Sequence, residues 1–239
     1  MSDGRDVTTG WDAVWASRAL PGAAGSVLQG LIDADGYDSA HGGVTERAWR
    51  EYVARWGATL GLAAGGSVVD VGCGAGAFLL PLAEAGVRVG GIDRSSVQLG
   101  LASRAIPEGE FAVADALDLA PEPRVDVVVS MSTFIYFPTL DYAARVAEAM
   151  VSRATRAVAI LDLADAARRA EDLRRRVRAA GGEAAYARRY AGLEHLYYDR
   201  EWTVGLLEAS GLSDVRCETQ SLDGYGNAPF RFNCWGFVP

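Results

Sequence analysis

The stretch that decides the fold is SVVDVGCGAG, residues 67–76. Its first five residues are mostly small and apolar, which predicts a buried strand. Glycine then occupies every second position, at Gly72, Gly74 and Gly76, and this spacing predicts a tight turn that leads from the strand into a helix. Because glycines let the backbone approach a bound molecule closely, the turn raises the question of which ligand it holds.

The chain downstream of this turn alternates between strand-like and helix-like segments. Such alternation predicts parallel strands joined by right-handed helical crossovers. The expected strands are 67–71, 88–92, 110–114, 124–130 and 156–162, and the expected helices between them are about 76–85, 96–104 and 139–150. Upstream, apolar residues recur at helical spacing in about 11–19, 27–32 and 46–60, so residues 1–60 are expected to form an N-terminal helical cap.

The segment after residue 163 breaks this rhythm. Residues 164–199 have mostly helical propensity and are dense in arginine and acidic residues. This composition fits either a solvated amphipathic helix or a helical lid inserted over the carboxyl edge of the sheet, and both interpretations stay open.

The C-terminal part is expected to return to the sheet. Asp199 is the expected N-cap of a last helix that ends at Gly211. Two strands near 213–220 and 230–238 are expected to follow as a hairpin. Because the sequence shows no internal repeat and no low-complexity linker, residues 1–239 are expected to form a single domain.

The composition limits the partners of the chain. Its 239 residues carry a formal net charge of −8, which argues against a nucleic-acid partner. No apolar stretch approaches the roughly 20 residues of a membrane span, and the N-terminal sequence has no signal or transit pattern. We therefore expect a cytoplasmic protein that binds neither nucleic acid nor a membrane, with a homodimer left open.

The cysteines do not form a recognisable motif. Cys73, Cys217 and Cys234 show no CxxC spacing, so neither a zinc site nor a disulfide scaffold is expected. Cys217 and Cys234 fall on the two final strands and could lie near each other, and we expect both to be reduced.

Three kinds of ligand compete for the glycine turn. A phosphate-binding P-loop requires a lysine, and the sequence has none. A dinucleotide fingerprint fits better, since Gly72, Gly74 and Ala77 match its glycine spacing. However, Asp70 ends the strand where a pyrophosphate would lie, and a carboxylate repels phosphates there. The same carboxylate attracts a cationic amine and a sulfonium, which favours S-adenosylmethionine and leaves an NAD-dependent oxidoreductase as an alternative.

Two further acids follow the next strands. Asp93 ends the second strand, where a carboxylate can accept hydrogen bonds from both ribose hydroxyls, and Asp115 follows the third, where it can accept from an adenine amino group. Each alone is compatible with an ordinary strand-end acid. Since ligands of open α/β sheets bind along the carboxyl edge, three acids on successive strand ends indicate a cofactor site.

Residues 67–162 resemble the class I S-adenosylmethionine-dependent methyltransferases. VVDVGCGAG, GGIDRS, VADALDL and VDVVVSMSTFIYF are similar to four motifs of that family. The resemblance implies an α/β, Rossmann-like fold with a seven-stranded, mostly parallel sheet whose last strand is antiparallel. It also implies a cofactor site made of Asp70, Gly72, Gly74 and Gly76 (methionine part), Asp93 with Arg94 (ribose), Asp115 and Ala116 (adenine), and Met131 (beside the sulfonium).

The departures from family patterns narrow the acceptor. The fourth strand runs into Ser-Met-Ser, residues 130–132, rather than the signature of enzymes that methylate nucleic-acid bases. Asp162 and Asp165 match part of the metal-ligand set of metal-dependent, catechol-type methyltransferases. Ser130 leaves that set incomplete, so no metal is expected. The stretches LEHLYYDREW and GYGNAPFRFN resemble small bacterial enzymes of the family without indicating a substrate.

The acceptor side is expected to come from the cap, the inserted segment and the last loop. His195 is a candidate base or a hinge residue. Tyr197 and Tyr198 either pack the lid on the sheet or surround the sulfonium, and Tyr37, Phe134 and Tyr136 are candidates to join that surround. Asn227 and Arg231 either bind an acceptor carboxylate or pin the hairpin. His41 is the weaker candidate base.

Two reactions follow from these candidates. The first is methyl transfer to a small metabolite at oxygen or nitrogen. The alternative is cyclisation of S-adenosylmethionine to a small cyclic amino acid, azetidine-2-carboxylate or 1-aminocyclopropane-1-carboxylate, with release of methylthioadenosine.

Overall fold

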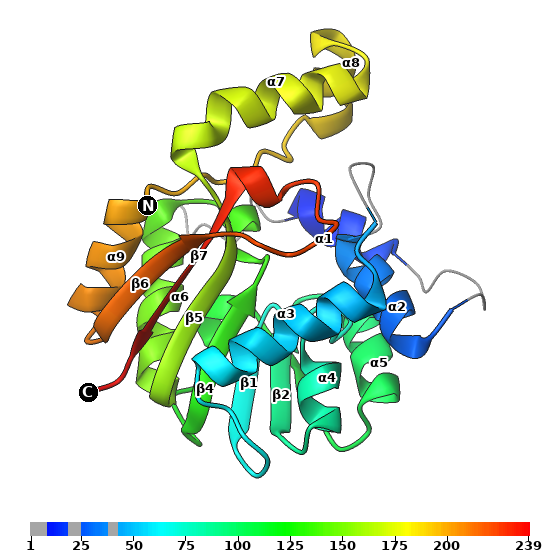
Figure 1. Ribbon diagram of the computed structural model, residues 1–239. Helices are drawn as coiled ribbons and strands as arrows, with labels where there is room; N and C mark the ends of the chain where they lie inside the picture. Colours follow the sequence, from blue (N-terminus) through cyan, green and yellow to red (C-terminus); the bar gives the residue numbers. More distant parts are fainter. Residues whose placement is uncertain (1–8, 19–24, 38–42) are drawn as a thin grey trace.

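The computed structural model describes residues 9–18, 25–37 and 43–239. Its centre is one seven-stranded sheet (Figure 1). The strands are β1 (Ser67–Val71), β2 (Arg88–Asp93), β3 (Glu110–Val113), β4 (Val125–Met131), β5 (Ala154–Ala164), β6 (Ser213–Thr219) and β7 (Arg231–Phe237). They lie in the order β3-β2-β1-β4-β5-β7-β6. β7 pairs antiparallel with β5 and β6, whereas the pairs among β1 to β5 are parallel, so the expected sheet is confirmed.

Helices cover both faces of the sheet (Figure 1). One face packs against α2 (Val27–Ile32), α3 (Glu46–Thr59), α4 (Leu79–Glu84) and α5 (Ser96–Ala105), and the other against α6 (Leu140–Arg153) and α9 (Arg200–Ala209). Trp49 and Trp56 are buried on the first face and Met150 on the second. The apolar stripes recognised in the sequence therefore face the core.

Side-chain caps explain where several helices begin. Thr45, Ser95 and Thr139 accept hydrogen bonds from backbone amides at the starts of α3, α5 and α6. Asp199 does the same for α9, as predicted, by accepting from the Trp202 amide. α4 starts later than predicted because the glycine turn and the residues after it lie ahead of the regular helix.

Shorter elements connect the strands and helices at the carboxyl edge. They are α1 (Thr9–Ala16), a π-type turn η2 (Asp33–Tyr37), and the 3₁₀ turns η3 (Ala116–Asp118), η4 (Phe134–Tyr136), η5 (Ala166–Arg168) and η6 (Ala228–Phe230). Figure 1 shows α1 and α2 beside this edge.

The inserted segment is helical in its first part only. It contains η5, α7 (Arg169–Ala180) and α8 (Glu183–Tyr190), which lie above the carboxyl edge of the sheet (Figure 1). The chain then returns through residues 191–198 without regular structure, held by backbone hydrogen bonds from Leu196 to Ile135 and from Tyr198 to Ala164. We refer to residues 166–198 as the arm. Within the described ranges, no helix is long and apolar enough to cross a membrane.

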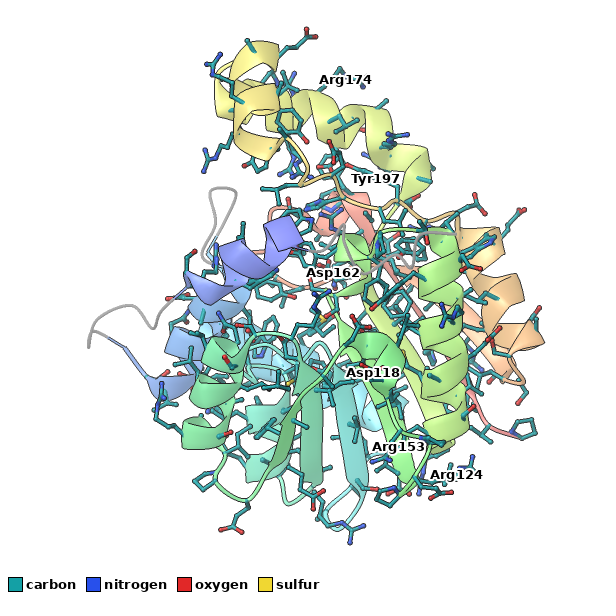
Figure 2. All side chains as sticks on the ribbon, turned by 180° about the vertical axis from the view of Figure 1, so that it is seen from behind. Asp118, Arg124, Arg153, Asp162, Arg174 and Tyr197 are labelled. Carbon is teal, nitrogen blue, oxygen red and sulfur yellow. A yellow bond between two sulfur atoms is a disulfide. The ribbon has the colours of Figure 1, made fainter. Side chains whose placement is uncertain are left out.

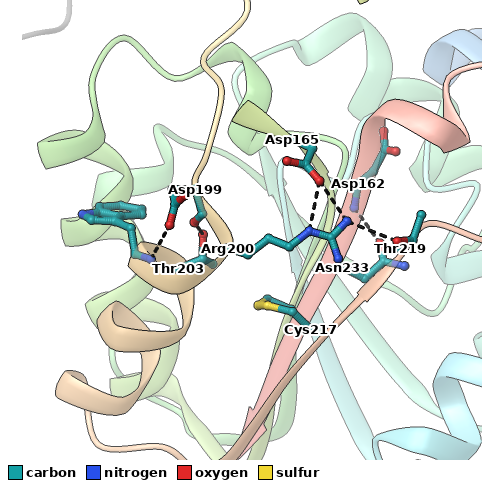
Figure 3. Close-up of a disulfide and its surroundings, with 10 residues drawn as sticks. Asp162, Asp165, Asp199, Arg200, Thr203, Cys217, Thr219 and Asn233 are labelled. Carbon is teal, nitrogen blue, oxygen red and sulfur yellow. Dashed lines mark hydrogen bonds and ion pairs between the residues drawn. A yellow bond between two sulfur atoms is a disulfide. The ribbon is translucent and has the colours of Figure 1, made fainter. Parts of the chain in front are cut away.

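One prediction about the cysteines is wrong. Cys217 on β6 lies directly opposite Cys234 on β7, with 4.2 Å between their Cα atoms, and the two are joined as a disulfide. The antiparallel register brings the two side chains together, which spacing along the chain does not reveal. Cys73 is buried and free. Figure 3 shows Cys217 beneath Arg200 of α9.

Candidate active site

A pocket opens at the carboxyl edge of the sheet, where the sequence predicts the cofactor. Its floor comes from the ends of β1, β2 and β4, and its roof from the N-terminal cap. Of the predicted cofactor residues, Asp70, Gly72, Gly74, Asp93, Arg94, Ala116 and Met131 line it, whereas Gly76 and Asp115 do not. Tyr37 and Tyr136 also line it.

The glycine turn has the backbone that its composition predicts. Gly72 and Gly74 have positive φ angles of 78° and 53°, which side chains disfavour. A Cβ at Gly72 would lie 2.3 Å from the side chain of Thr133, and one at Gly74 would lie 2.3 Å from the carboxylate of Asp35. Gly76 packs instead against Ala102 of α5, so its part is in the fold.

Asp70 places an acid at the base of the pocket. Its side chain is only 1% exposed, and its Oδ1 has no hydrogen-bond partner in the described part of the chain. Burial raises the pKa of this carboxyl well above its usual range, and nearby Asp35 and Asp93 raise it further. A cationic ligand would remove this penalty, which fits the interpretation made from the sequence.

Asp93 is held in one orientation at the end of β2. Its carboxylate accepts hydrogen bonds from the backbone amides of Gly74, at 2.9 Å, and Ser95, at 2.8 Å. The bond from Gly74 joins the second strand end to the glycine turn, and the bond from Ser95 is local. The arrangement suits a carboxylate that receives hydroxyl groups from a ligand.

Asp115 lies behind the pocket wall. It accepts from the Leu117 amide at 2.9 Å and from the Tyr142 hydroxyl, and Arg94 lies 3.5 Å away. The neighbouring Ala116 and Tyr142 line the pocket. Asp115 therefore fixes the residues around the predicted adenine position without itself forming the surface.

A third pocket acid, Asp35, was missed in the sequence. It lies in η2 of the N-terminal cap, and its carboxylate accepts hydrogen bonds from the amides of Ala75, at 2.6 Å, and Ala77, at 3.1 Å. Burial raises the pKa of Asp35 from 3.8 to about 7, and Asp93 contributes in the same direction. Among several acids in a turn-rich loop, nothing in the sequence distinguished it.

Aromatic side chains form the roof of the pocket. Trp11 and Trp15, one helical turn apart on α1, pack on Tyr136 with ring centroids 4.6 and 5.4 Å away. Tyr37 packs on Trp49 at 4.6 Å. The i, i+4 spacing of the two tryptophans was the available signal for this roof.

A polar pair lies beside Met131 at the ends of β4 and β5. Ser132 lines the pocket and donates a 2.7 Å hydrogen bond to the buried carboxylate of Asp162, which also accepts from the Tyr225 hydroxyl at 2.9 Å. Burial raises the pKa of Asp162, while Arg231 and the hydrogen bonds oppose the rise. Both Ser132 and Asp162 have positive φ angles, 59° and 66°, which non-glycine residues adopt only at special positions.

The other acceptor-side candidates lie against α7 of the arm. Tyr197 donates a 2.8 Å hydrogen bond to Asp172 of α7, and Asn227 accepts one from Arg175. Figure 2 shows Tyr197 where the arm meets the body. Arg231 is buried and lies near Asp172 and Asp162.

Three further candidates lie away from the pocket surface. Tyr198 is buried under the second face of the sheet, where its hydroxyl donates to the Phe134 carbonyl at 2.7 Å, and Phe134 is buried with it. His195 stacks behind the roof, with its ring 5.3 Å from that of Trp11. His41 lies outside the described residues.

Asp162 and Asp165 do not face the same space. Asp165 receives two hydrogen bonds from Arg200, at 3.0 and 2.8 Å, which Figure 3 shows together with the contact of Arg200 to Thr219. Within the described ranges, His, Cys, Asp and Glu form no group of three that could hold a metal.

Comparisons with known proteins agree with this geometry. A family model described as a methyltransferase domain matches residues 68–157. Trans-aconitate 2-methyltransferase of Paracidovorax citrulli (strain AAC00-1) is 44% identical over 64 residues, which are 26% of this chain and 25% of that protein. The chain therefore matches only about a quarter of the length of this curated relative.

Solved structures share the whole fold. Magnesium protoporphyrin IX methyltransferase from Synechocystis PCC 6803, with bound S-adenosylmethionine, matches with a TM-score of 0.65 and 19% identity over 100% of both chains. The N-methyltransferase NodS from Bradyrhizobium japonicum WM9, in complex with S-adenosylhomocysteine, matches with a TM-score of 0.63 and 17% identity over 98% of this chain and 100% of that one.

These comparisons separate the alternatives that the sequence left open. At such low identity the structures show a shared fold, and these two relatives hold S-adenosylmethionine or S-adenosylhomocysteine. Cyclisation of the cofactor and NAD-dependent oxidation gain no support from them. Residues 68–157 of the chain therefore match a methyltransferase domain, and the chain shares its fold with solved methyltransferases.

Proposed function

We propose that this protein transfers a methyl group from S-adenosylmethionine to a small metabolite, at oxygen or nitrogen. The observation that carries the proposal is the convergence of Asp35, Asp70 and Asp93 on one pocket behind the glycine turn. Three carboxylates in a largely buried space repel one another, so the pocket favours a ligand with positive charges. S-adenosylmethionine carries an ammonium and a sulfonium and supplies the methyl group.

The described residues fit that cofactor in parts. Asp70 and the open backbone at Gly72 and Gly74 suit the methionine portion, and the oriented carboxylate of Asp93 suits the ribose. Ala116 and Tyr142 line the place expected for adenine. Met131, at the end of β4, lies on the side from which an acceptor would approach.

The acceptor is proposed to lie under the aromatic roof. Trp11, Trp15 and Tyr136 give that end of the pocket an apolar surface, which suits a compact organic molecule. Ser132 donates its own hydroxyl proton to Asp162, so its oxygen is free to accept a hydrogen bond from an O–H or N–H group. An acceptor group oriented in this way would lose its proton toward Asp162. The positioning of acceptor and methyl donor would supply much of the rate enhancement.

Product analysis tests the reaction class. The purified protein is incubated with S-adenosylmethionine, first alone and then with fractionated small metabolites. We expect the cofactor to survive alone and S-adenosylhomocysteine to accumulate only with an acceptor. Enzyme-dependent methylthioadenosine in the absence of an acceptor would contradict methyl transfer and revive cyclisation.

A further inference from the structure

We propose that Arg176, Arg231 and His195 form an anion subsite behind the aromatic roof of the pocket, which takes a carboxylate carried by the acceptor. The inference rests on the proposed function, because it names the chemical class of that function's acceptor. It assigns a new role to Arg176, which the sequence did not single out.

Arg231 is a buried cation whose hydrogen-bond donors are only partly used. The residue is 2% exposed, and its Nε and Nη1 have no hydrogen-bond partner in the described part of the chain. The carboxylates of Asp162 and Asp172 lie 4.0 and 3.9 Å away, too far for hydrogen bonds. Buried donors without acceptors are unfavourable, so the site favours an additional acceptor oxygen.

The two nearby carboxylates already have other partners. Asp162 accepts from Ser132 and Tyr225, and Asp172 accepts from Arg175 and Tyr197. These bonds hold the carboxylates in their present places. They therefore partly offset the charge of Arg231 without satisfying its donors.

Arg176 is a second cation on the same side. Its guanidinium lies over the rings of Tyr186 and Tyr190, at 5.8 and 5.3 Å, and its Nη1 lies 2.6 Å from Nδ1 of His195. Among the described residues it forms no ion pair with a carboxylate. Because the guanidinium can only donate, Nδ1 of His195 accepts, and the neutral ring carries its proton on Nε2.

His195 is buried near two cations. Burial lowers its pKa well below the usual value, and Arg176 and Arg231 lower it further. The rings packed against it, Trp11 and Tyr136, carry no charge. A bound anion would stabilise the charged imidazolium and reverse this shift.

The subsite adjoins the pocket roof. His195 contacts Trp11 and Tyr136, with ring centroids 5.3 and 5.5 Å away, and both of these residues line the pocket. Carboxylates thus lie at the cofactor end, whereas cations lie behind the roof beside the hydrogen-bonded carboxylates of Asp162 and Asp172. An acceptor with a carboxylate matches this polarity, with its nucleophile directed toward Ser132.

The titration of His195 tests the subsite without knowledge of the natural acceptor. The chain has two histidines, so the His195 ring proton is assigned by NMR from a His195→Gln variant. The full-length protein is saturated with S-adenosylhomocysteine, and trans-aconitate is added as a carboxylate probe, with its uncharged trimethyl ester and inorganic phosphate as comparisons. We expect trans-aconitate to raise the His195 midpoint by about 1 pH unit, saturably, and the other two to leave it unchanged.

Variants separate the subsite from the cofactor site. Arg176→Gln should abolish the response to trans-aconitate and change the affinity for S-adenosylhomocysteine less than about twofold, because Arg176 does not line the cofactor pocket. Arg178→Gln, exposed on the same helix, is the matched control and should keep the response. If the wild-type protein does not bind S-adenosylhomocysteine at all, the proposed function is overturned instead.

Three results would overturn the subsite itself while S-adenosylhomocysteine still binds. They are an unchanged His195 midpoint with trans-aconitate, an equal response in Arg176→Gln, and a response to phosphate or to the ester that matches the response to trans-aconitate.

Discussion

The carboxylate of Asp35 hydrogen-bonds the amide of Ala75 at 2.6 Å and thereby joins the N-terminal cap to the glycine turn. The same carboxylate also accepts from Ala77, so it spans the turn just ahead of α4. Cap and cofactor turn are thus connected through one titratable group that lines the pocket. We therefore expect cofactor binding, cap position and pH to be interdependent.

Cofactor binding is expected to strengthen as pH rises. The pKa of Asp35 is raised to about 7 in the unliganded protein, mainly by burial, and a cationic ligand favours the charged form and lowers it again. Binding therefore releases a proton, and the affinity for S-adenosylmethionine should rise about tenfold between about pH 6 and pH 8. Calorimetry in two buffers of different ionisation enthalpy measures the released protons. Asp35→Asn should flatten the profile, whereas Asp118→Asn, an exposed acid, should not.

The stability of the unliganded protein should also depend on the protonation of Asp35, but in the opposite direction. Its free energy of unfolding should fall as pH rises. Because the folded-state pKa of Asp35 is above its ordinary value of 3.8, the contribution of this group is fully present below about pH 4 and is lost as pH rises toward 7. Urea unfolding of the wild type and Asp35→Asn across this window measures the difference. If the difference in free energy of unfolding between the two proteins did not change with pH, Asp35 would have an ordinary pKa.

Gly74→Ala should disconnect the cap from the turn. The new Cβ would lie 2.3 Å from Asp35 Oδ1, and the φ of 53° is unfavourable for alanine. We expect the affinity for S-adenosylhomocysteine to fall at least about tenfold, which corresponds to about 1.4 kcal/mol. Gly192→Ala is the matched control, because it has a φ of 72° but no atom within 4 Å of the added Cβ. Equal losses of affinity in the two variants would mean that backbone strain, and not the contact with Asp35, causes the effect.

The arm should loosen when the buried acceptor that joins α7 to the returning segment of the arm is removed. Asp172 is fully buried and accepts hydrogen bonds from Arg175 and Tyr197, so Asp172→Ala leaves both donors without their acceptor. Hydrogen exchange across residues 169–198 should speed up markedly in this variant and stay unchanged in Glu171→Gln, its exposed neighbour on α7. A separate prediction concerns lid closure in the wild type. Slower hydrogen exchange across 185–199 with ligand bound would support the proposal that the arm closes over the site as a lid. Unchanged exchange on saturation with S-adenosylhomocysteine would contradict that proposal.

The disulfide is expected to stabilise the outer strands. Cys217 and Cys234 are 17 residues apart, and closing a loop of that size contributes about 3 kcal/mol to the free energy of unfolding in the chain-entropy model. Urea unfolding with and without reductant tests this value. If the protein is denatured and alkylated before any reductant is added, Cys73 alone should be labelled. Labelling of all three cysteines would show that the pair is reduced.

The part of the site that is local in sequence could be predicted, and the part made by distant segments could not. Asp70 and Gly72 lie two residues apart, so a strand followed by a glycine turn placed both correctly. Asp35 reaches the turn from 40 residues upstream, and no periodic pattern marks such a contact. Asn227 is predicted either to bind an acceptor carboxylate or to pin the hairpin, and in the structure it accepts a hydrogen bond from Arg175, which lies on an inserted helix whose packing the sequence does not encode locally.

The central claim is tested most directly by calorimetry of the purified protein at pH 8 with S-adenosylhomocysteine and, separately, with NAD. The account predicts one-to-one binding of S-adenosylhomocysteine and none of NAD. Asp93→Ala should weaken binding at least about tenfold, because each hydrogen bond to a charged group contributes about 1.5–3 kcal/mol, and Asp118→Ala should leave it unchanged. Binding of NAD without binding of S-adenosylhomocysteine would contradict the account.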